Sequence, residues 1–247
     1  MRLAGIDLAW QGGINTSAVA VGRLDADILY VEQVYPDRHG NDDIVAALSK
    51  PAPVTGVAID APTIINNASG QRPCEKVLAS VYAGRHAGCH PTNRSLYPDA
   101  RSVALAHALQ AQGYEHAAEP SVCRWQIECY PHPALIEIFG LERRLGYKKG
   151  RVIDKRTGQS QLAGLIARLG DSSVLALKIP LAISDYLDAT RIHSLKGRLL
   201  KQNEDVLDAI VCLYIAGLYA SCVTHALFGS PEEGYIYVPR VCCITGQ

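Results

Sequence analysis

The sequence predicts an α/β fold in which helices flank a mixed β-sheet. Three β-rich runs at residues 1–10, 15–22 and 28–35 follow one another closely, which is typical of an antiparallel three-stranded meander. Further β-rich runs at residues 54–60 and 124–130 alternate with segments of helical periodicity. A long helix late in the chain is apolar nearly all round, so we expect it to be buried.

The composition describes an ordinary globular protein that fits one large domain or two small ones. Of the 247 residues, 48% are hydrophobic and 19% are charged, which argues against disorder. The formal net charge is zero, so a polyanion has to be met by a local patch. No secretory signal precedes the first strand, and the longest apolar run, residues 206–218, falls short of the ~20 residues of a membrane helix. We therefore expect a soluble, cytoplasmic protein with no membrane partner.

The first strand carries an aspartate inside an apolar run. Asp7 follows Leu3, Ala4 and Ile6, and a glycine-containing turn comes after it. A buried ionised carboxylate without a partner is costly. Asp7 therefore either caps the turn, pairs with a cation or binds a metal ion, and the strand alone leaves these alternatives open.

A second acidic residue ends a later strand. Asp60 closes the run at 54–60 just before Pro62, which cannot continue the ladder, so Asp60 stands at the carboxyl end of its strand. Open α/β sheets hold their ligands at that edge. Helical periodicity, capping residues and flanking prolines or glycines place the other elements. Helices are expected at residues 41–48, 74–82, 99–112, 134–145, 159–169, 179–187 and 204–224, and a last strand at 229–238.

Two basic segments interrupt this pattern. Residues 66–98 form a long polar stretch with one short helix, and such long loops are usually functional or mobile. A second group of cations follows the helix at 134–145 and could clamp phosphates, although a solvated surface is the commoner explanation of such a run. Its members are Arg143, Arg144, Lys148, Lys149, Arg151, Lys155 and Arg156.

Carboxylates recur where the pattern predicts burial or a strand end. Glu128 lies at the end of the run at 124–130, and Asp205 and Asp208 project from one face of the buried helix, where a free charge is very unfavourable. Together with Asp7 and Asp60 they form a candidate site. Mg²⁺ prefers carboxylate oxygens, and two such ions about 4 Å apart can activate water and stabilise a leaving oxygen. Convergence of these acids would itself imply a cation.

Four motifs carry a resemblance to a known family. GIDLAW at 5–10, AIDAP at 58–62, ECYPHPAL at 128–135 and EDVLDA at 204–209 resemble family 429 of the domains of unknown function, whose members are predicted ribonuclease H-like nucleases. The DVLDA motif is similar to the paired aspartates on the last helix of RuvC-type resolvases. The resemblance implies a single ribonuclease H-like domain over residues 1–247, with the three-stranded meander plus parallel strands, flanking helices and a basic insertion around 66–98.

The same resemblance implies a nuclease that uses two Mg²⁺ or Mn²⁺ ions to hydrolyse DNA or RNA, including branched forms. Asp7, Asp60 and Asp208 would be metal ligands, with Asp205 as a second helix ligand. Glu128 would be a further ligand or a base that orients water. The backbone phosphates would be held by Lys148, Lys149 and Arg151. The sequence departs from the superfamily at Asp60, where a glutamate is common, and in the basic insertion, which minimal ribonuclease H domains lack.

Two alternatives stay open. Actin-like and sugar-kinase ATPases share the strand topology and place a Gly-Ile-Asp strand before a glycine-containing hairpin that embraces phosphate. The residues that would fit this pattern of a phosphotransferase are Gly5, Ile6, Asp7, Gly12, Gly13, Thr16 and Ser17. The other alternative is a ribonuclease H-like module that binds nucleic acid without cutting it. The sequence also leaves the oligomeric state open, a homodimer included.

Overall fold

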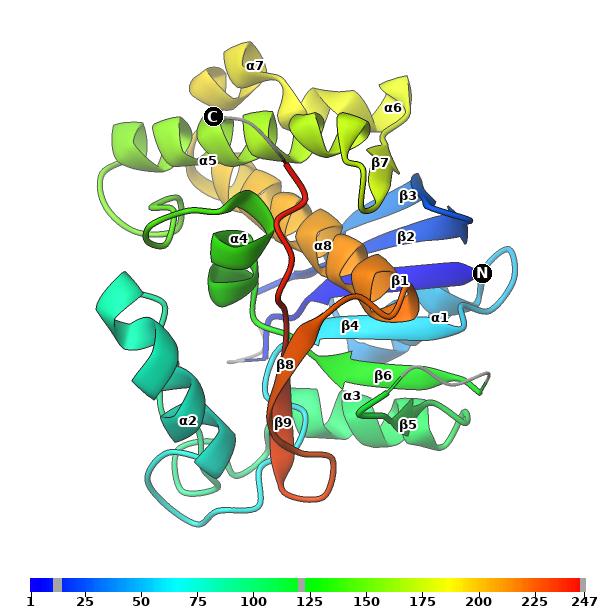
Figure 1. Cartoon of the computed structure of the whole chain (residues 1–247), viewed down its shortest axis with the longest axis vertical. Helices are drawn as coiled ribbons and strands as arrows, with labels where there is room; N and C mark the ends of the chain where they lie inside the picture. Colours follow the sequence, from blue (N-terminus) through cyan, green and yellow to red (C-terminus); the bar gives the residue numbers. More distant parts are fainter. Residues whose placement is uncertain (11–14, 120–122, 245–247) are drawn as a thin grey trace.

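A seven-stranded sheet forms the centre of the molecule in the computed structural model, which describes residues 1–10, 15–119 and 123–244 (Figure 1). Its strands are β1 Arg2–Asp7, β2 Ser17–Asp25, β3 Ile28–Arg38, β4 Gly56–Asp60, β5 Glu115–His116, β6 Trp125–Glu128 and β7 Ala176–Lys178. They lie in the order β5-β6-β4-β1-β2-β3-β7. The β1, β2 and β3 strands form an antiparallel meander, and β4, β6 and β5 extend the sheet beyond β1 in parallel. The predicted α/β class and mixed sheet are confirmed.

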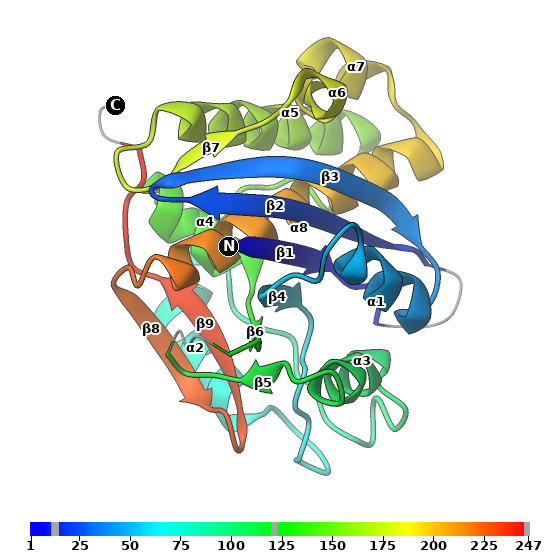
Figure 2. The same ribbon diagram turned by 90° about the vertical axis from the view of Figure 1, so that its right-hand side faces the viewer.

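Helices cover both faces of this sheet. They are α1 Asn41–Ser49, α2 Pro73–Tyr82, α3 Arg101–Gln110, α4 Pro131–Phe139, α5 Val152–Arg168, α6 Leu181–Ser184, α7 Ala189–Ser194 and α8 Gly197–Ala220. The buried residues of α4, α5 and α8 form the larger core with one face, and those of α1 and α3 form a smaller core with the other (Figure 1 and Figure 2). Among the described residues, none of these helices combines the length and apolar character needed to cross a bilayer.

Gly5, in the middle of β1, allows α8 to lie directly against the sheet. A Cβ atom at Gly5 would lie 1.9 Å from the backbone nitrogen of Leu213 and 2.3 Å from the carbonyl oxygen of Ala209. A side chain at this position would therefore push the helix away. Because side chains alternate along a strand, Asp7 leaves the sheet on the same side as Gly5. The close approach thus brings Asp7 next to the turn of α8 that carries Asp208.

The basic segment at 66–98 packs against a C-terminal hairpin. The hairpin consists of β8 His225–Ser230 and β9 Gly234–Pro239, and the predicted single strand at 229–238 is wrong in that it covers the turn and β9 but only the last two residues of β8. Gly229 and Gly234 flank the turn with φ values of +96° and +99°, a conformation that glycine adopts without strain. Leu78 and Tyr82 of α2 form a small core with residues of this hairpin (Figure 1).

The bounds of two neighbouring helices, which differ from the prediction, define the loop between them. The helix expected at 134–145 begins at Pro131, because proline is accepted in a first turn, and it ends at Phe139, because Gly140 takes a left-handed conformation with φ +62°. The helix expected at 159–169 begins at Val152. Residues 140–151 are therefore a loop between α4 and α5, and it reaches back to the end of the sheet.

Candidate metal centre

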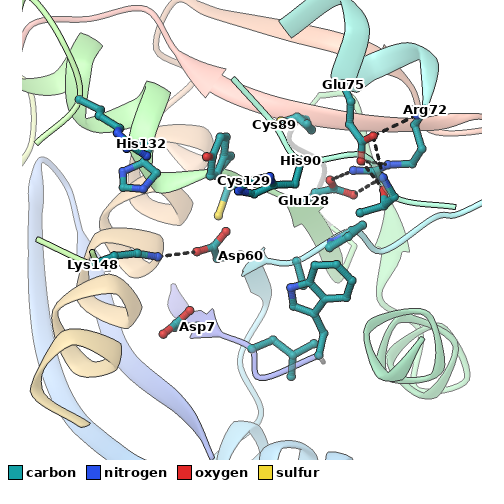
Figure 3. Close-up of a pocket in the computed structure, with 18 of the residues that line it drawn as sticks. Asp7, Asp60, Arg72, Glu75, Cys89, His90, Glu128, Cys129, His132 and Lys148 are labelled. Carbon is teal, nitrogen blue, oxygen red and sulfur yellow. Dashed lines mark hydrogen bonds and ion pairs between the residues drawn. The ribbon is translucent and has the colours of Figure 1, made fainter. Parts of the chain in front are cut away.

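Three aspartates from distant parts of the chain meet at one end of the sheet. Asp7 ends β1, Asp60 ends β4, and Asp208 lies in the middle of α8. The parallel strands β1 and β4 pair in register with Asp7 opposite Asp60, so both carboxylates leave the same edge of the sheet on the same face. One carboxylate oxygen from each of the three aspartates lies within 4.8 Å of the other two. In Figure 3, Asp7 and Asp60 lie next to each other at the edge of the pocket.

The loop at 140–151 adds a tyrosine and a lysine to this triad of aspartates. The Tyr147 hydroxyl donates a hydrogen bond of 2.7 Å to Asp208 Oδ1. Lys148 Nζ lies 2.7 Å from Asp208 Oδ2 and 3.6 Å from Asp60 Oδ2. Gly158 of α5 fixes the loop, since a Cβ there would lie 2.1 Å from the carbonyl oxygen of Gly146. The loop backbone therefore rests directly on α5, and this contact positions Tyr147 and Lys148.

A second group of charges lies one turn earlier on α8. Asp205 shares a hydrogen bond with Asp7, and Lys201 Nζ lies 2.6 Å from Asp205 Oδ1 and 2.8 Å from Glu204 Oε1. Asp205 and Glu204 are both buried. Asp7, a member of the triad, thus also contacts Asp205, so the structure brings together the four aspartates that the sequence analysis selected.

The cluster carries more negative charge than its lysines neutralise. Burial raises the pKa of Asp60 to about 8, with Lys148 opposing this rise and the charges of Asp7 and Asp208 adding to it. Burial and the charge of Asp7 likewise raise the pKa of Asp205 to about 8, and burial raises the pKa of Asp7. Burial would lower the pKa of Lys148, but Asp208 and the other neighbouring acids outweigh it and raise that pKa well above its ordinary value. Raised pKa values of this kind indicate acids whose charges neighbouring cations do not fully compensate.

Glu128 lies outside this cluster. In the pairing of β4 with β6, Glu128 stands opposite Ile59, so it shares the face of Ile59, whereas Asp60 faces the other side. Its carboxylate accepts hydrogen bonds of 2.6 and 2.9 Å from the Arg72 guanidinium and one of 2.9 Å from the Thr63 backbone N–H. The structure therefore does not place Glu128 with the other acids. Glu128 is instead the partner of a buried arginine.

Asp7 and Asp60 of the triad line one pocket of about 360 Å³ together with the Arg72–Glu128 pair, and the third member, Asp208, is fully buried. Figure 3 shows Arg72, Glu75 and Glu128 together on one side of it, with Lys148 and His132 on the other. From the predicted cationic run, Arg144, Lys148 and Lys149 line the pocket. Arg151, predicted to hold phosphate, is exposed and instead pairs with Asp154 on α5 at 3.0 Å.

Several residues at the site were not identified from the sequence. Tyr147 bonds to Asp208 directly, yet the only sequence signal was its position next to Lys148. His132 is buried in the pocket wall and belongs to the ECYPHPAL motif, where the sequence analysis selected Glu128. Arg72 looks from the sequence like one of many cations in a basic loop, and the structure buries it.

The glycine-containing hairpin of the phosphotransferase alternative is described in part. Gly12 and Gly13 lie outside the described residues. Ser17 is fully buried, and its hydroxyl accepts a hydrogen bond of 3.1 Å from the Ala9 backbone N–H. This hydroxyl therefore orders the turn after β1, and the residues that line the pocket do not include it.

Fold and site together define an α/β protein with an acidic cluster, at the end of its sheet, that could hold a metal ion. Residues 5–232 match the model of the family described as "Protein of unknown function (DUF429)". The chain therefore belongs to this family, as its four motifs predicted. Comparison with curated proteins and with solved structures finds no match.

Proposed function

We propose that this protein is a divalent-metal-dependent nuclease with a ribonuclease H-like fold. The observation that carries the proposal is the convergence of Asp7, Asp60 and Asp208, whose carboxylates lie within 4.8 Å of one another. In the part of the chain that the structure describes, one ammonium group, that of Lys148, forms ion pairs with this triad. Three carboxylates at such short range repel one another strongly unless further positive charge joins them.

The residues present fit a hard divalent cation. Asp208 Oδ2 is buried, and its partner among the described residues is the ammonium group of Lys148, 2.7 Å away. Carboxylate oxygens of this kind are the ligands that Mg²⁺ and Mn²⁺ prefer. Asp7, Asp60 and Asp208 would hold one ion, and Asp7 with Asp205 would hold a second. Ions held there would supply an activated water and stabilise the leaving oxygen of a phosphodiester.

The surrounding residues support a phosphate-bearing substrate. Lys149 and Arg144 line the same pocket as Asp7 and Asp60, from the loop that carries Lys148. Lys148 compensates the carboxylates in the structure described here, and it becomes available to a phosphate oxygen when another cation takes over that charge. The sheet supports the same assignment, since it combines an antiparallel meander with parallel strands and has the acids at the ends of β1 and β4.

A cleavage assay with matched variants tests the proposal. Labelled single-stranded DNA and RNA are incubated with Mn²⁺, Mg²⁺ or a chelator, using the unmodified chain, Asp7→Asn and the exposed control Asp42→Asn on α1. Cleavage should require the divalent ion, fall by about 100-fold or more in Asp7→Asn and stay unchanged in Asp42→Asn. Equal cleavage by Asp7→Asn, or cleavage that persists in the chelator, would contradict the proposal. ATP turnover in the same reactions without cleavage would favour the phosphotransferase instead.

A further inference from the structure

Two members of the acidic triad, Asp7 and Asp60, line a pocket, and the third, Asp208, is buried next to them. The Asp208 side chain is 0% exposed and that of Asp60 is 16% exposed. The loop at 140–151 contributes one part of the pocket wall, and residues of the basic segment, Cys89, His90 and Thr92, contribute another. Figure 3 shows His90 and Cys89 above Asp60, on the side away from Asp7. A phosphodiester reaches the triad only if the nucleotide that carries it enters between these walls.

The volume of the pocket matches a single small molecule. At about 360 Å³ it lies near the lower end of the range of roughly 300–1,000 Å³ that is usual for small-molecule sites. A space of this size accommodates a single nucleotide and not a stacked base pair. Enzymes that act inside such pockets take their target from a single strand or extrude it from the duplex.

The lining of the pocket combines the two kinds of side chain that bind a nucleotide. Arg144 and Lys149 line it together with Asp7 and Asp60, and they are cations suited to phosphate oxygens. Trp10 and Tyr130 supply aromatic faces elsewhere in the lining, and aromatic faces bind any base by stacking. Trp10 is held edge-on against Tyr97, with ring centroids 4.6 Å apart, so its position is fixed from behind.

We propose that the pocket binds one nucleotide of a single strand, with its phosphate at the triad beside Lys149 and Arg144 and its base stacked on Trp10. This inference rests on the proposed nuclease function and deepens it by naming the substrate as single-stranded or frayed nucleic acid. It assigns the basic segment a role as well, since that segment supplies the wall that excludes an intact duplex.

Binding of mononucleotides tests the pocket without relying on turnover. Calorimetry in Mg²⁺ compares adenosine 5′-monophosphate with inorganic phosphate, using the unmodified chain, Trp10→Ala, Trp10→Phe and a control, Tyr30→Ala on β3 outside the pocket. The nucleotide should bind at least about tenfold more tightly than phosphate, Trp10→Ala should remove that gain, and Trp10→Phe should retain it. The affinity for Mn²⁺ should be the same in all four proteins. Equal binding of nucleotide and phosphate, or no effect of Trp10→Ala, overturns the inference.

A substrate comparison separates this inference from the function on which it rests. One labelled oligonucleotide is offered as a single strand and as a blunt duplex, with Mn²⁺ and with the unmodified chain or Asp7→Asn. The single strand should be cut at least about tenfold faster. Equal Mn²⁺-dependent cutting of both forms that Asp7→Asn abolishes rejects the pocket inference and leaves the nuclease standing. Absence of Asp7-dependent cutting of either form rejects the proposed function, and the inference with it.

Discussion

Two groups of carboxylates meet at the same pocket, and they differ in how their charge is balanced. Glu75 and Glu128 share one guanidinium: Arg72 Nε donates to Glu75 at 2.8 Å, and its two terminal nitrogens donate to Glu128 at 2.9 and 2.6 Å. Thr63 and Thr92 donate further hydrogen bonds to these oxygens. In the triad, by contrast, Lys148 forms ion pairs with Asp60 and Asp208, and no basic side chain among the described residues forms one with Asp7.

This difference separates the acids with a structural role from those that are available to a ligand. A planar guanidinium offers five donors in a fixed arrangement, so Arg72 can satisfy two carboxylates within the folded chain itself. An ammonium group is a point charge on a flexible stem, and the one at Lys148 leaves the triad short of positive charge. A buried acid is therefore a metal-ligand candidate when its compensation within the chain is incomplete.

Removing the arginine should have the largest effect on folding. Arg72→Met leaves Glu128 and Glu75 buried without a counterion, and breaking a buried pair in this way costs about 3–5 kcal/mol of unfolding free energy. Urea denaturation measures this loss. Arg23→Met, which breaks an exposed pair with Asp25 on the first hairpin, should leave the unfolding free energy nearly unchanged. An equally small change for Arg72→Met would mean that the two carboxylate groups do not differ as described.

Neutralising one acid in each group should separate metal binding from folding. Asp208→Asn keeps the side-chain shape but removes a carboxylate of the triad, so Mn²⁺ affinity should fall about 100-fold or more. Glu128→Gln should leave Mn²⁺ affinity within about twofold, because Glu128 faces Arg72 and not the triad. Titration calorimetry gives both affinities. A similar loss in the two variants would place Glu128 among the ligands after all.

Two glycines on one helix test how the site is positioned. A Cβ at Gly158 meets the backbone of the loop that carries Tyr147 and Lys148, so Gly158→Ala should destabilise the protein by about 1–3 kcal/mol and weaken Mn²⁺ binding. Gly164 lies on the same helix, where a Cβ has open space around it. Gly164→Ala should therefore stabilise the protein by roughly 0.5–1 kcal/mol and leave the site unchanged. Thermal unfolding with and without Mn²⁺ distinguishes the two; identical behaviour would argue against the loop contact.

The lysine of the triad should oppose metal binding in the free protein. Lys148→Met removes the ammonium group that competes for Asp60 and Asp208, and Mn²⁺ should bind about tenfold more tightly as a result. Lys149→Met serves as the control, since Lys149 lines the pocket without an ion pair to the triad in the described structure, and its Mn²⁺ affinity should not change. Calorimetry again provides the measurement, and weaker binding in Lys148→Met would show that the lysine supports the ion.

Stability should also depend on pH when no metal is bound. Burial raises the pKa of Asp60 and of Asp205 to about 8, above their ordinary value of 3.8, so the folded chain holds protons that the unfolded chain has released. The unfolding free energy should therefore fall as the pH rises from 6.5 to 8. Burial lowers the pKa of His132 to about 3 and that of His116 to about 4, so these two histidines affect stability below pH 6.5. Asp60→Asn should flatten the slope in urea denaturation, and an unchanged slope would contradict the assignment.

Local pattern was sufficient to predict the acids of the triad. Asp7 and Asp60 each end an apolar run, and parallel pairing of those runs places them side by side. Asp208 was predicted as a site residue because it is a carboxylate in a helix that is apolar nearly all round. The sheet and most helices were predicted for the same reason, because apolar periodicity within a segment reports its buried face. The two-residue β5 and three-residue β7 are too short to show such a period.

The rest of the site depends on long-range contacts that periodicity does not encode. Glu128 was grouped with the triad because it also ends a strand. In the pairing of β4 with β6, however, Glu128 lies opposite Ile59 and not Asp60, so its side chain leaves the other face of the sheet. Tyr147 and Lys148 reach Asp208 because the backbone of their loop packs directly on Gly158 of the following helix. Arg72 is buried through partners on β6 and α2, which no local feature of a basic loop indicates.

Anomalous diffraction from crystals soaked in Mn²⁺ tests the central claim most directly. The account predicts a peak within coordination distance of Asp7, Asp60 and Asp208, with Lys148 displaced from its position between Asp60 and Asp208. No peak should occur beside Glu128, whose carboxylate Arg72 already satisfies. A map without a peak at the three aspartates, with Lys148 still 2.7 Å from Asp208, would contradict the account.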